Sequence, residues 1–384
     1  MPQFSQAISK LKASSTVVFN TRAQEMKRQG IDVVAMTAGE PDFQPPDHVL
    51  EAARDAVDQG LTKYTPAEGT FELREAVCGK FARENNLEYT PEQIIVGTGG
   101  KQILYNGFMA VLNPGDEVII IAPYWVTYPA QIELAGGVPV PVSAPPETGF
   151  IPDIDDIRSA ITARTRAIVL NSPANPTGAV YPPEVVISIA ELVNEHDLWL
   201  FADDLYEHLI YDGKFTAAAS YARERTLIIH GASKAYALTG WRIGYGAGPI
   251  DLIKAMNRLQ GQSTSGANSI AQYAVTVALN EFDKTRAFID MTLEAYRERR
   301  NLLVSGLNRM GLKTPNPRGA FYVMSDLTVI DPNENKAALR LLEDAHVGVV
   351  PGTDFLAPGH ARFSYATSLD NVTEALERIS RLLN

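Results

Sequence analysis

The chain has 384 residues, of which 45% are hydrophobic and 21% are charged, and its formal net charge is -11 at pH 7. This balance excludes a wholly disordered chain, and the negative charge disfavours binding to nucleic acids or anionic membranes. The single cysteine, Cys78, excludes an intrachain disulfide and a thiolate zinc cluster. We expect a cytoplasmic protein, because no signal peptide and no apolar stretch approaching the roughly 18 residues of a membrane span is seen.

The N-terminal part is predicted to contain an arm, residues 1–15, followed by a helix. Ser14–Thr16 are typical of a helix N-cap region, and Gly30 ends the amphipathic pattern that follows them. A short strand at 33–36 then leads into a turn-rich loop. We expect residues 16–44 to pack with a smaller domain formed later in the chain.

Residues 45–290 are predicted to form the large domain. Short apolar runs alternate there with helical patterns; the runs cover residues 94–96, 117–121, 167–170, 198–202, 226–230 and 243–247. Buried runs of this length between helices indicate an α/β fold whose largely parallel sheet is covered on both faces.

Residues 291–384 are predicted to form a smaller α+β domain. A long helical pattern at about 284–310 leads into it, and its short strands are expected at 319–325, 347–350 and 362–366. A last helix is predicted at about 371–383, so the chain divides into one large and one small domain.

A candidate nucleophile, Lys234, follows the predicted strand at 226–230. The carboxyl ends of parallel strands border the crevice in which α/β proteins bind ligands. A lysine reacts as a nucleophile when burial or a nearby cation lowers its pKa, and Arg242 could supply that cation and also bind a phosphate. A lone lysine is more often an exposed loop residue.

Two other strand ends carry polar groups. Asn175 lies in an Asn-Pro-Thr-Gly stretch after the run at 167–170, and Asp203 and Tyr206 follow the run at 198–202. Taken alone, the first stretch is a turn and Asp203 is as readily a helix cap. An amide, a carboxylate and a lysine-arginine pair at the ends of three strands of one sheet together predict a ligand site.

These motifs resemble those of the fold-type I pyridoxal-phosphate aminotransferases and, more narrowly, the prokaryotic aspartate aminotransferases of class I. The resemblance extends from the Gly39 loop to Arg362. It implies an α/β fold with a mostly parallel, mixed sheet in the large domain and a smaller α+β domain. It also implies pyridoxal 5'-phosphate as the cofactor and a homodimer whose active sites are shared across the interface.

The resemblance assigns the residues around the cofactor ring. Lys234 would hold pyridoxal phosphate through a Schiff base and would carry a proton when it is freed. Asp203 would lie against the ring nitrogen, Asn175 and Tyr206 would bind the ring oxygen, and Trp125 would cover the ring. The implied catalytic residues are Lys234, Asp203 and Tyr206.

The cofactor phosphate is expected where a helix begins after a strand, because backbone amides at a helix N-terminus bind anions. The residues implied at the phosphate are Gly99, Gly100, Lys101, Ser233 and Arg242. The family usually has a hydroxyl residue in this loop, which Gly and Lys replace here. Tyr64 matches the tyrosine that reaches the neighbouring subunit's phosphate. The glycine spacing does not match a dinucleotide-binding fingerprint.

The amino-acid substrate is implied to contact Gly39, Trp125, Asn175, Arg362, Ser14, Thr16 and Lys101. Arg362 matches the arginine that binds the substrate α-carboxylate through two parallel hydrogen bonds. Ser14, Thr16 and Lys101 match the positions that recognise an acidic side chain in one subgroup. The serine at position 14 or 15 is equally well interpreted as a helix cap.

The resemblance implies an aminotransferase that moves the amino group of L-aspartate to 2-oxoglutarate by a ping-pong reaction. An aromatic amino acid or prephenate/glutamate aminotransferase on the same site remains an alternative, as does a pyridoxal-phosphate lyase of this fold. An effector-sensing domain of a transcription regulator would need a DNA-binding region that the polar head is too short to supply. The six histidines show no metal-ligand spacing, so no metal site is predicted.

Overall fold

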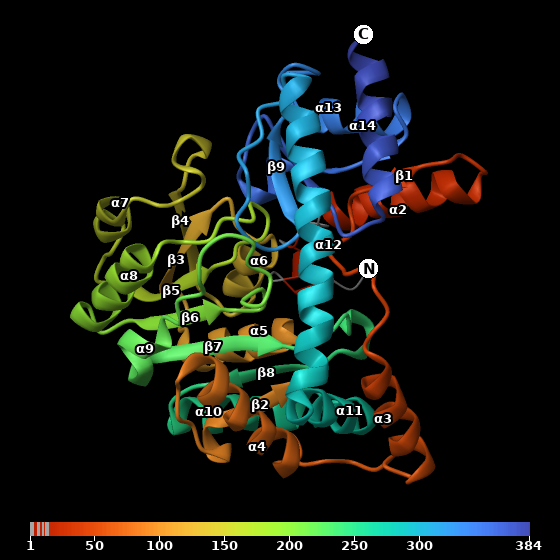
Figure 1. The fold of residues 1–384 in the computed structure, drawn as a ribbon. Helices are drawn as coiled ribbons and strands as arrows, with labels where there is room; N and C mark the ends of the chain where they lie inside the picture. The colour runs from red at the N-terminus through yellow and green to blue at the C-terminus, as the bar shows by residue number, and fades with distance from the viewer. Residues whose placement is uncertain (1–3, 6–7, 10, 12–14) are drawn as a thin grey trace.

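The computed structural model describes residues 4–5, 8–9, 11 and 15–384, and Figure 1 shows their arrangement. Its centre is a seven-stranded sheet in the order β2-β8-β7-β6-β5-β3-β4. The strands are β2 (Ile94–Gly97), β3 (Glu117–Ala122), β4 (Val138–Ser143), β5 (Thr165–Asn171), β6 (Trp199–Asp203), β7 (Thr226–Gly231) and β8 (Gly244–Ala247). Neighbouring strands are parallel except at β8, which is antiparallel to both β2 and β7. The predicted α/β class with a mixed, mostly parallel sheet is therefore confirmed.

The central strands are buried on both faces. In β3, Ile119 and Ile121 join one hydrophobic cluster, whereas Val118 and Ile120 join another. Successive strand residues point to opposite faces, so an uninterrupted apolar run fills two cores at once. The surrounding helices are α3 (Asp47–Asp58), α4 (Phe71–Lys80), α5 (Gly100–Val111), α6 (Thr127–Leu134), α7 (Ile154–Ser159), α8 (Pro183–Glu195), α9 (Ala219–Ala222), α10 (Ile250–Ser263) and α11 (Ser269–Asn280).

Strand β4 is an edge strand that the sequence patterns did not predict. It contains Pro139 and Pro141, which pair in register with Val118 and Ile120 of β3. Proline lacks an amide donor, so a strand containing it is tolerated at a sheet edge, where one side needs no partner. Pro139 and Pro141 are two residues apart, so their nitrogen atoms, which lack a hydrogen, face the same edge of β4. The opposite edge keeps its hydrogen-bonding groups and can pair with β3.

The smaller part of the molecule combines N-terminal and carboxyl-terminal segments of the chain. It contains a sheet in the order β11-β12-β9 and a two-stranded parallel pair of β1 and β10. The strands are β1 (Val34–Ala35), β9 (Tyr322–Asp326), β10 (Val347–Gly348), β11 (Val350–Pro351) and β12 (His360–Ser364), and the helices are α2 (Ser15–Arg28), α13 (Glu334–Glu343) and α14 (Leu369–Leu383). The single strand predicted at 347–350 is thus two short strands that belong to two sheets.

The long helix α12 (Phe282–Arg309) connects the two parts of the molecule, as Figure 1 shows. Its N-terminal half packs near α11, and its C-terminal half packs against α14. The predicted domain boundary at residue 290 falls inside this helix, and the division into domains stays a prediction. Within the described residues, no helix has the length and apolar character that crossing a bilayer requires.

Candidate active site

A cavity of about 500 Å³ lies where the carboxyl ends of the central strands meet the smaller part of the molecule. Most of the residues expected from the sequence line it, namely Gly39, Gly100, Lys101, Trp125, Asn175, Asp203, Tyr206, Ser233, Lys234, Arg242 and Arg362. The fold thus brings together positions separated by more than 300 residues. Asp203 ends β6, and Asn175 and Lys234 follow β5 and β7, as expected for the crevice of a parallel α/β sheet. Arg362 comes from within β12 of the second sheet.

Lys234 follows β7 and points its amine into the cavity region. Its Nζ donates a hydrogen bond to the carbonyl oxygen of Gly39 at 2.5 Å. Burial, assisted by the Arg362 cation, lowers the pKa of Lys234 to about 8. More of this amine is therefore neutral near pH 7 than in an exposed lysine, and the neutral amine is the nucleophilic form.

Asp203 is the last residue of β6 and is only 5% exposed. Its Oδ2 accepts a hydrogen bond from Tyr128 Oη at 2.6 Å, whereas its Oδ1 has no partner among the described residues. Burial raises the pKa of Asp203 to about 6, although the Tyr128 hydrogen bond opposes the rise. An unpaired buried carboxylate oxygen is costly, so this position is suited to a ligand that donates a hydrogen bond.

Arg362 enters the cavity from β12 and is 3% exposed. Its Nη1 donates to Asn175 Oδ1 at 3.0 Å, and its Nη2 donates to the Thr37 carbonyl oxygen at 2.9 Å. The guanidinium carbon lies 4.6 Å from the centre of the Tyr322 ring. Among the described residues no carboxylate pairs with Arg362, so this buried cation is available to an anionic ligand.

The turn between β2 and α5 is a second candidate anion site. Gly99 is the N-cap of α5 with φ +86°, and no described side chain caps the helix. A Cβ at Gly99 would lie 2.5 Å from Arg242 Nη2, so glycine lets the guanidinium approach the loop. Arg242 is held by hydrogen bonds to the carbonyl oxygens of Thr239 and Thr98 at 2.8 and 3.3 Å. Uncapped helix amides and an adjacent arginine suit a phosphate.

Trp125 and Lys101 lie together on the outer wall of the cavity. The Lys101 Nζ is 4.9 Å from the centre of the Trp125 ring, and the Trp125 ring meets the Tyr128 ring edge-on at 5.6 Å. Partial burial and the Arg242 cation lower the pKa of Lys101. This wall therefore offers a cation and an aromatic face to the same ligand.

The sequence patterns missed several residues of the site. Tyr128 lies one helical turn beyond Trp125, a spacing that could have suggested a shared face. Tyr322 Oη is 2.9 Å from Tyr206 Oη. The same Tyr322 oxygen would lie 2.9 Å from a Cβ added at Gly39. No local motif marks Tyr322 or Thr37, because they come from segments that meet the large sheet only in the folded chain.

Four expected residues are not among those that line the described cavity. One is Gly99, which directly precedes Gly100 at the start of α5. Tyr64 is 98% exposed and borders a different cavity of about 880 Å³ formed with α4 and α11. Its expected role toward a neighbouring subunit stays a prediction. Ser14 and the side chain of Thr16 lie outside the described part of the chain.

The comparisons with known proteins agree with this geometry. The family model of aminotransferase class I and II matches residues 31–379. An aspartate/prephenate aminotransferase of Thermus thermophilus is 55% identical over 383 residues, which cover 100% of this chain and 99% of the relative. An aspartate aminotransferase of Bacillus subtilis is 42% identical over 393 residues, covering 98% of each chain.

A solved structure gives the same result in three dimensions. The aspartate aminotransferase of Thermus thermophilus with maleate superposes with a TM-score of 0.98 at 54% identity, and all of both chains is covered. The aspartate aminotransferase of Rhizobium meliloti gives a TM-score of 0.95 at 44% identity, covering 100% of this chain and 99% of the other. The likeness therefore includes both the large sheet and the smaller part of the molecule.

Proposed function

The chain belongs to the class I and II aminotransferases, and we propose that it transfers the amino group of L-aspartate to 2-oxoglutarate, giving oxaloacetate and L-glutamate. One observation carries the proposal. A single cavity holds the amine of Lys234, whose pKa is lowered, and two buried charged groups, Asp203 and Arg362. In the described part of the chain, Asp203 Oδ1 has no hydrogen-bond partner and Arg362 has no acidic partner. These three groups suit a cavity that binds an amino acid together with a ring that carries an aldehyde.

The enzyme is an aminotransferase whose family uses pyridoxal phosphate. When bound, the cofactor supplies an aldehyde that accepts an amino group and a ring that takes up the negative charge formed at the substrate Cα. The residues present fit this group. The unpaired Asp203 Oδ1 suits a protonated ring nitrogen, and the glycine loop before α5 with Arg242 suits the phosphate.

The chain's own residues supply the proton transfers. Lys234 Nζ is the nucleophile that would hold the cofactor, and once released it would remove the proton at the substrate Cα. Asp203 would keep the ring nitrogen protonated by accepting its hydrogen bond through Oδ1. Asn175 and Tyr206 would bind the ring oxygen, and Ser233, Gly99 and Gly100 would contribute to the phosphate site. Trp125 would cover the ring and exclude water from it.

We assign the substrate α-carboxylate to Arg362. Its hydrogen bonds to Asn175 and Thr37 fix the plane of the guanidinium before the substrate arrives, which reduces the entropy lost on binding. The planar fork matches a carboxylate through two parallel hydrogen bonds. Gly39 leaves room beside it, since Tyr322 occupies the space that a side chain would need.

The substrate side chain would extend toward Lys101 on the outer wall. A cation there favours a second carboxylate, and the relative from Thermus thermophilus has been solved with maleate, a dicarboxylate. The aromatic face of Trp125 beside Lys101 also suits a ring. The name of the relative that is 55% identical includes prephenate, so prephenate is the second candidate substrate.

We further propose that the protein acts as a homodimer with shared active sites. Tyr64 is fully exposed in the single chain and lies beside a cavity of about 880 Å³, as expected for a residue that a partner covers. Residues 45–290 and 291–384 would then be the large and small domains of each subunit, joined by α12.

A half-reaction panel tests the proposed function. The protein loaded with pyridoxal phosphate is mixed with one amino acid and no oxo acid, and its absorbance is followed. We expect the bound cofactor to be converted to pyridoxamine phosphate, fastest with aspartate and glutamate. Lys234→Ala is expected to lose the covalently bound chromophore and to slow the conversion by several orders of magnitude. A lyase would consume the amino acid without accumulating pyridoxamine phosphate, and that result would overturn the proposal.

A further inference from the structure

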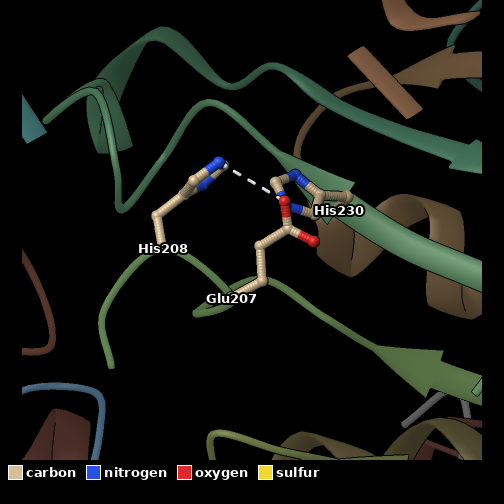
Figure 2. Close-up of side chains that lie close together, drawn as sticks. All are labelled: Glu207, His208 and His230. Atoms are coloured by element: carbon tan, nitrogen blue, oxygen red, sulfur yellow. Dashed lines mark ion pairs between the residues drawn. The ribbon is translucent and has the colours of Figure 1, made fainter. Parts of the chain in front are cut away.

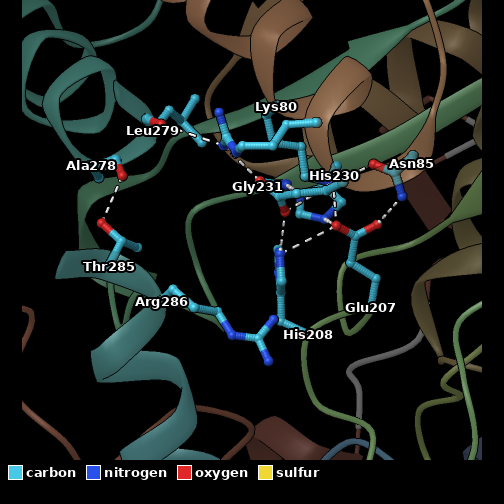
Figure 3. Close-up of polar contacts among 12 residues, drawn as sticks. Lys80, Asn85, Glu207, His208, His230, Gly231, Ala278, Leu279, Thr285 and Arg286 are labelled. Atoms are coloured by element: carbon cyan, nitrogen blue, oxygen red, sulfur yellow. Dashed lines mark hydrogen bonds and ion pairs between the residues drawn. The ribbon is translucent and has the colours of Figure 1, made fainter. Parts of the chain in front are cut away.

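A buried polar cluster lies outside the cavity, against the strand ends that carry the active-site residues. We call it the Lys80 cluster, and it consists of Lys80, Glu84, Asn85, Glu207, His208 and His230. Figure 3 labels all of these residues except Glu84. None of these side chains lines the cavity of about 500 Å³. The steps proposed for transamination do not use them.

The first half of the cluster comes from one irregular helical turn. Helix α4 ends at Lys80 and continues as a π-helical turn, Phe81–Asn85, which the left-handed residue Asn86 closes at φ 55°. The wider turn brings Asn85 Oδ1 within 2.8 Å of Lys80 Nζ, and Glu84 lies 3.9 Å from the same nitrogen. Such turns occur often at functional sites.

Glu207 is the centre of the cluster. Its Oε1 accepts a hydrogen bond from Lys80 Nζ, and its Oε2 accepts one from Asn85 Nδ2 at 3.0 Å. The Nε2 atoms of His208 and His230 each lie 3.3 Å from Oε1. The Lys80 side chain is completely buried and that of Glu207 is 5% exposed, so the pair is shielded from water.

The charges of the cluster follow from its contacts. Burial would raise the pKa of Glu207, but Lys80, His230 and His208 outweigh it and hold that pKa well below its usual range. Burial and the Lys80 cation lower the pKa of His230 to about 4. His230 Nδ1 accepts a hydrogen bond from the Gly231 amide at 2.7 Å, so the ring proton belongs on Nε2, facing Glu207. The cluster therefore has a negative Glu207 and a neutral His230.

Glu207, His208 and His230 also place ligand-type atoms within 4.8 Å of one another. Figure 2 shows how these three side chains face one another. A metal ion at that point would lie beside the Lys80 nitrogen, which already occupies Glu207 Oε1. A second cation there would be strongly repelled in a buried site. Lys80 thus supplies the positive charge of the cluster.

The cluster joins the two strand ends that present the active-site groups. Glu207 directly follows Tyr206 and is four residues beyond Asp203 at the end of β6. His230 lies in β7, four residues before Lys234. Ile229, the residue before His230, pairs with Asp203 across β7 and β6. The 3.3 Å approach of His230 Nε2 to Glu207 Oε1 therefore links the segment that carries Asp203 to the segment that carries Lys234 from outside the cavity.

We propose that Lys80 and Glu207 are positioning residues that hold the ends of β6 and β7 so that Asp203, Tyr206 and Lys234 engage pyridoxal phosphate together. The proposal rests on the proposed function, because it assumes that the cofactor binds at Lys234. It assigns no chemical step to the cluster. It predicts that loss of the buried ion pair lowers the affinity for pyridoxal phosphate more than it lowers the stability of the fold.

The test compares Lys80→Met, Glu207→Gln and the double variant with wild type. The matched control is Glu117→Gln, which makes the same change in a carboxylate that is 7% exposed and paired with Arg164 at the opposite end of the sheet. For each protein we would measure the dissociation constant for pyridoxal phosphate, the pH at which the bound chromophore changes colour, and the unfolding temperature without cofactor.

We expect the cluster variants to raise the cofactor dissociation constant by about tenfold, a typical effect of contacts that support a bound group from outside. We also expect them to shift the pH of the colour change, whereas Glu117→Gln changes only the unfolding temperature. The double variant removes both charges of the Lys80–Glu207 pair together, so it should unfold near the wild-type temperature and still bind the cofactor weakly.

Several results would overturn the proposal. Wild-type cofactor affinity in the double variant would do so, as would an equal loss in Glu117→Gln. Failure of the double variant to fold would show that the cluster supports the whole domain. Added Zn²⁺ that raises the unfolding temperature of wild type, but not of Glu207→Gln, would show a metal site. If wild type itself fails to bind pyridoxal phosphate, the proposed function is wrong.

Discussion

Burial moves the pKa values of Lys234 and Asp203 in opposite directions, to about 8 and about 6. In both residues the charged form loses hydration, so the lysine gives up its proton more readily and the aspartate keeps it longer. Both groups can therefore change protonation within about one unit of pH 7. These pKa values suit the proposed roles, in which Lys234 moves a proton and Asp203 keeps the ring nitrogen protonated.

Tyr128 provides a direct test of the Asp203 assignment. Affinity for pyridoxal phosphate should rise as pH increases through the pKa of Asp203, because the carboxylate form accepts the hydrogen bond of the ring nitrogen. Tyr128→Phe removes a donor that stabilises this carboxylate. A hydrogen bond to a charged group contributes about 1.5–3 kcal/mol, so the midpoint should move upward by about one to two pH units.

The measurement is the cofactor dissociation constant between about pH 5 and pH 9 in cofactor-free protein. Tyr181→Phe is the control, because Tyr181 is also a buried tyrosine but makes no hydrogen bond to Asp203. Its midpoint should match wild type. An unchanged midpoint in Tyr128→Phe would mean that Asp203 does not set the pH dependence.

Lys101 tests the choice of substrate. Lys101→Met keeps the aliphatic chain beside Trp125 and removes the charge. We expect the half-reaction with aspartate to slow on the order of tenfold to a hundredfold, and the half-reaction with phenylalanine to change little. Rapid-mixing absorbance measurements give both rates. Equal losses would show that Lys101 serves the phosphate instead.

The sequence was informative about residues that carry chemistry at strand ends. Lys234, Asp203 and Asn175 each follow a short apolar run, so their convergence follows from the geometry of a parallel sheet. Tyr128 and Tyr322 could not be found in this way. Their side chains reach the site through packing of a helix and of a second sheet, and local sequence does not encode that packing.

At the scale of the element, the turn from β2 to α5 combines backbone conformation with anion binding. Gly99 has φ +86° and ψ 161°, a region that is open essentially to glycine. Its lack of a side chain also lets Arg242 approach. The turn therefore places uncapped helix amides and a guanidinium around one point.

We predict that Gly99→Ala weakens cofactor binding more than it weakens the fold. The strained backbone should cost on the order of 1–3 kcal/mol of stability, and the displaced Arg242 should raise the dissociation constant for pyridoxal phosphate about tenfold or more. The control is Gly115→Ala, since Gly115 has φ +89° and no atom within 4 Å of an added Cβ. It should lose stability only.

Thermal unfolding of cofactor-free protein and equilibrium titration with the cofactor separate the two effects. Equal cofactor affinities in Gly99→Ala and wild type would contradict the phosphate assignment.

The elements that the sequence did not predict also have local physical causes. Strand β4 carries two prolines that only an edge position tolerates, and the π-helical turn after Lys80 has no distinctive sequence pattern.

At the scale of the whole molecule, Tyr64 is the residue that the single chain leaves unexplained. A tyrosine that is 98% exposed makes no contribution to the core, yet it lies beside a cavity of about 880 Å³. Aromatic residues are enriched in the centres of protein interfaces. This is the arrangement expected if Tyr64 completes the site of a second copy of the chain.

Hybrid dimers test this arrangement. In the proposed dimer, Lys234→Ala and Tyr64→Ala would each damage a different half of a shared site. A dimer with one subunit of each kind would then contain one site with both residues intact and one site with neither. Random exchange in an equal mixture makes about half of the dimers hybrid, so activity should recover to about a quarter of wild type.

The matched control replaces Tyr64→Ala with Arg362→Ala. Arg362 and Lys234 line the same cavity of one chain, so no pairing of these two variants restores a complete site. The activity of the mixture after subunit exchange should therefore equal the summed residual activities of the two parent variants. Recovery in the control would mean that Arg362 acts across the interface, and no recovery with Tyr64→Ala would place Tyr64 outside the partner's site. The two mixtures together show which residues one chain supplies to its own site and which it supplies to its partner.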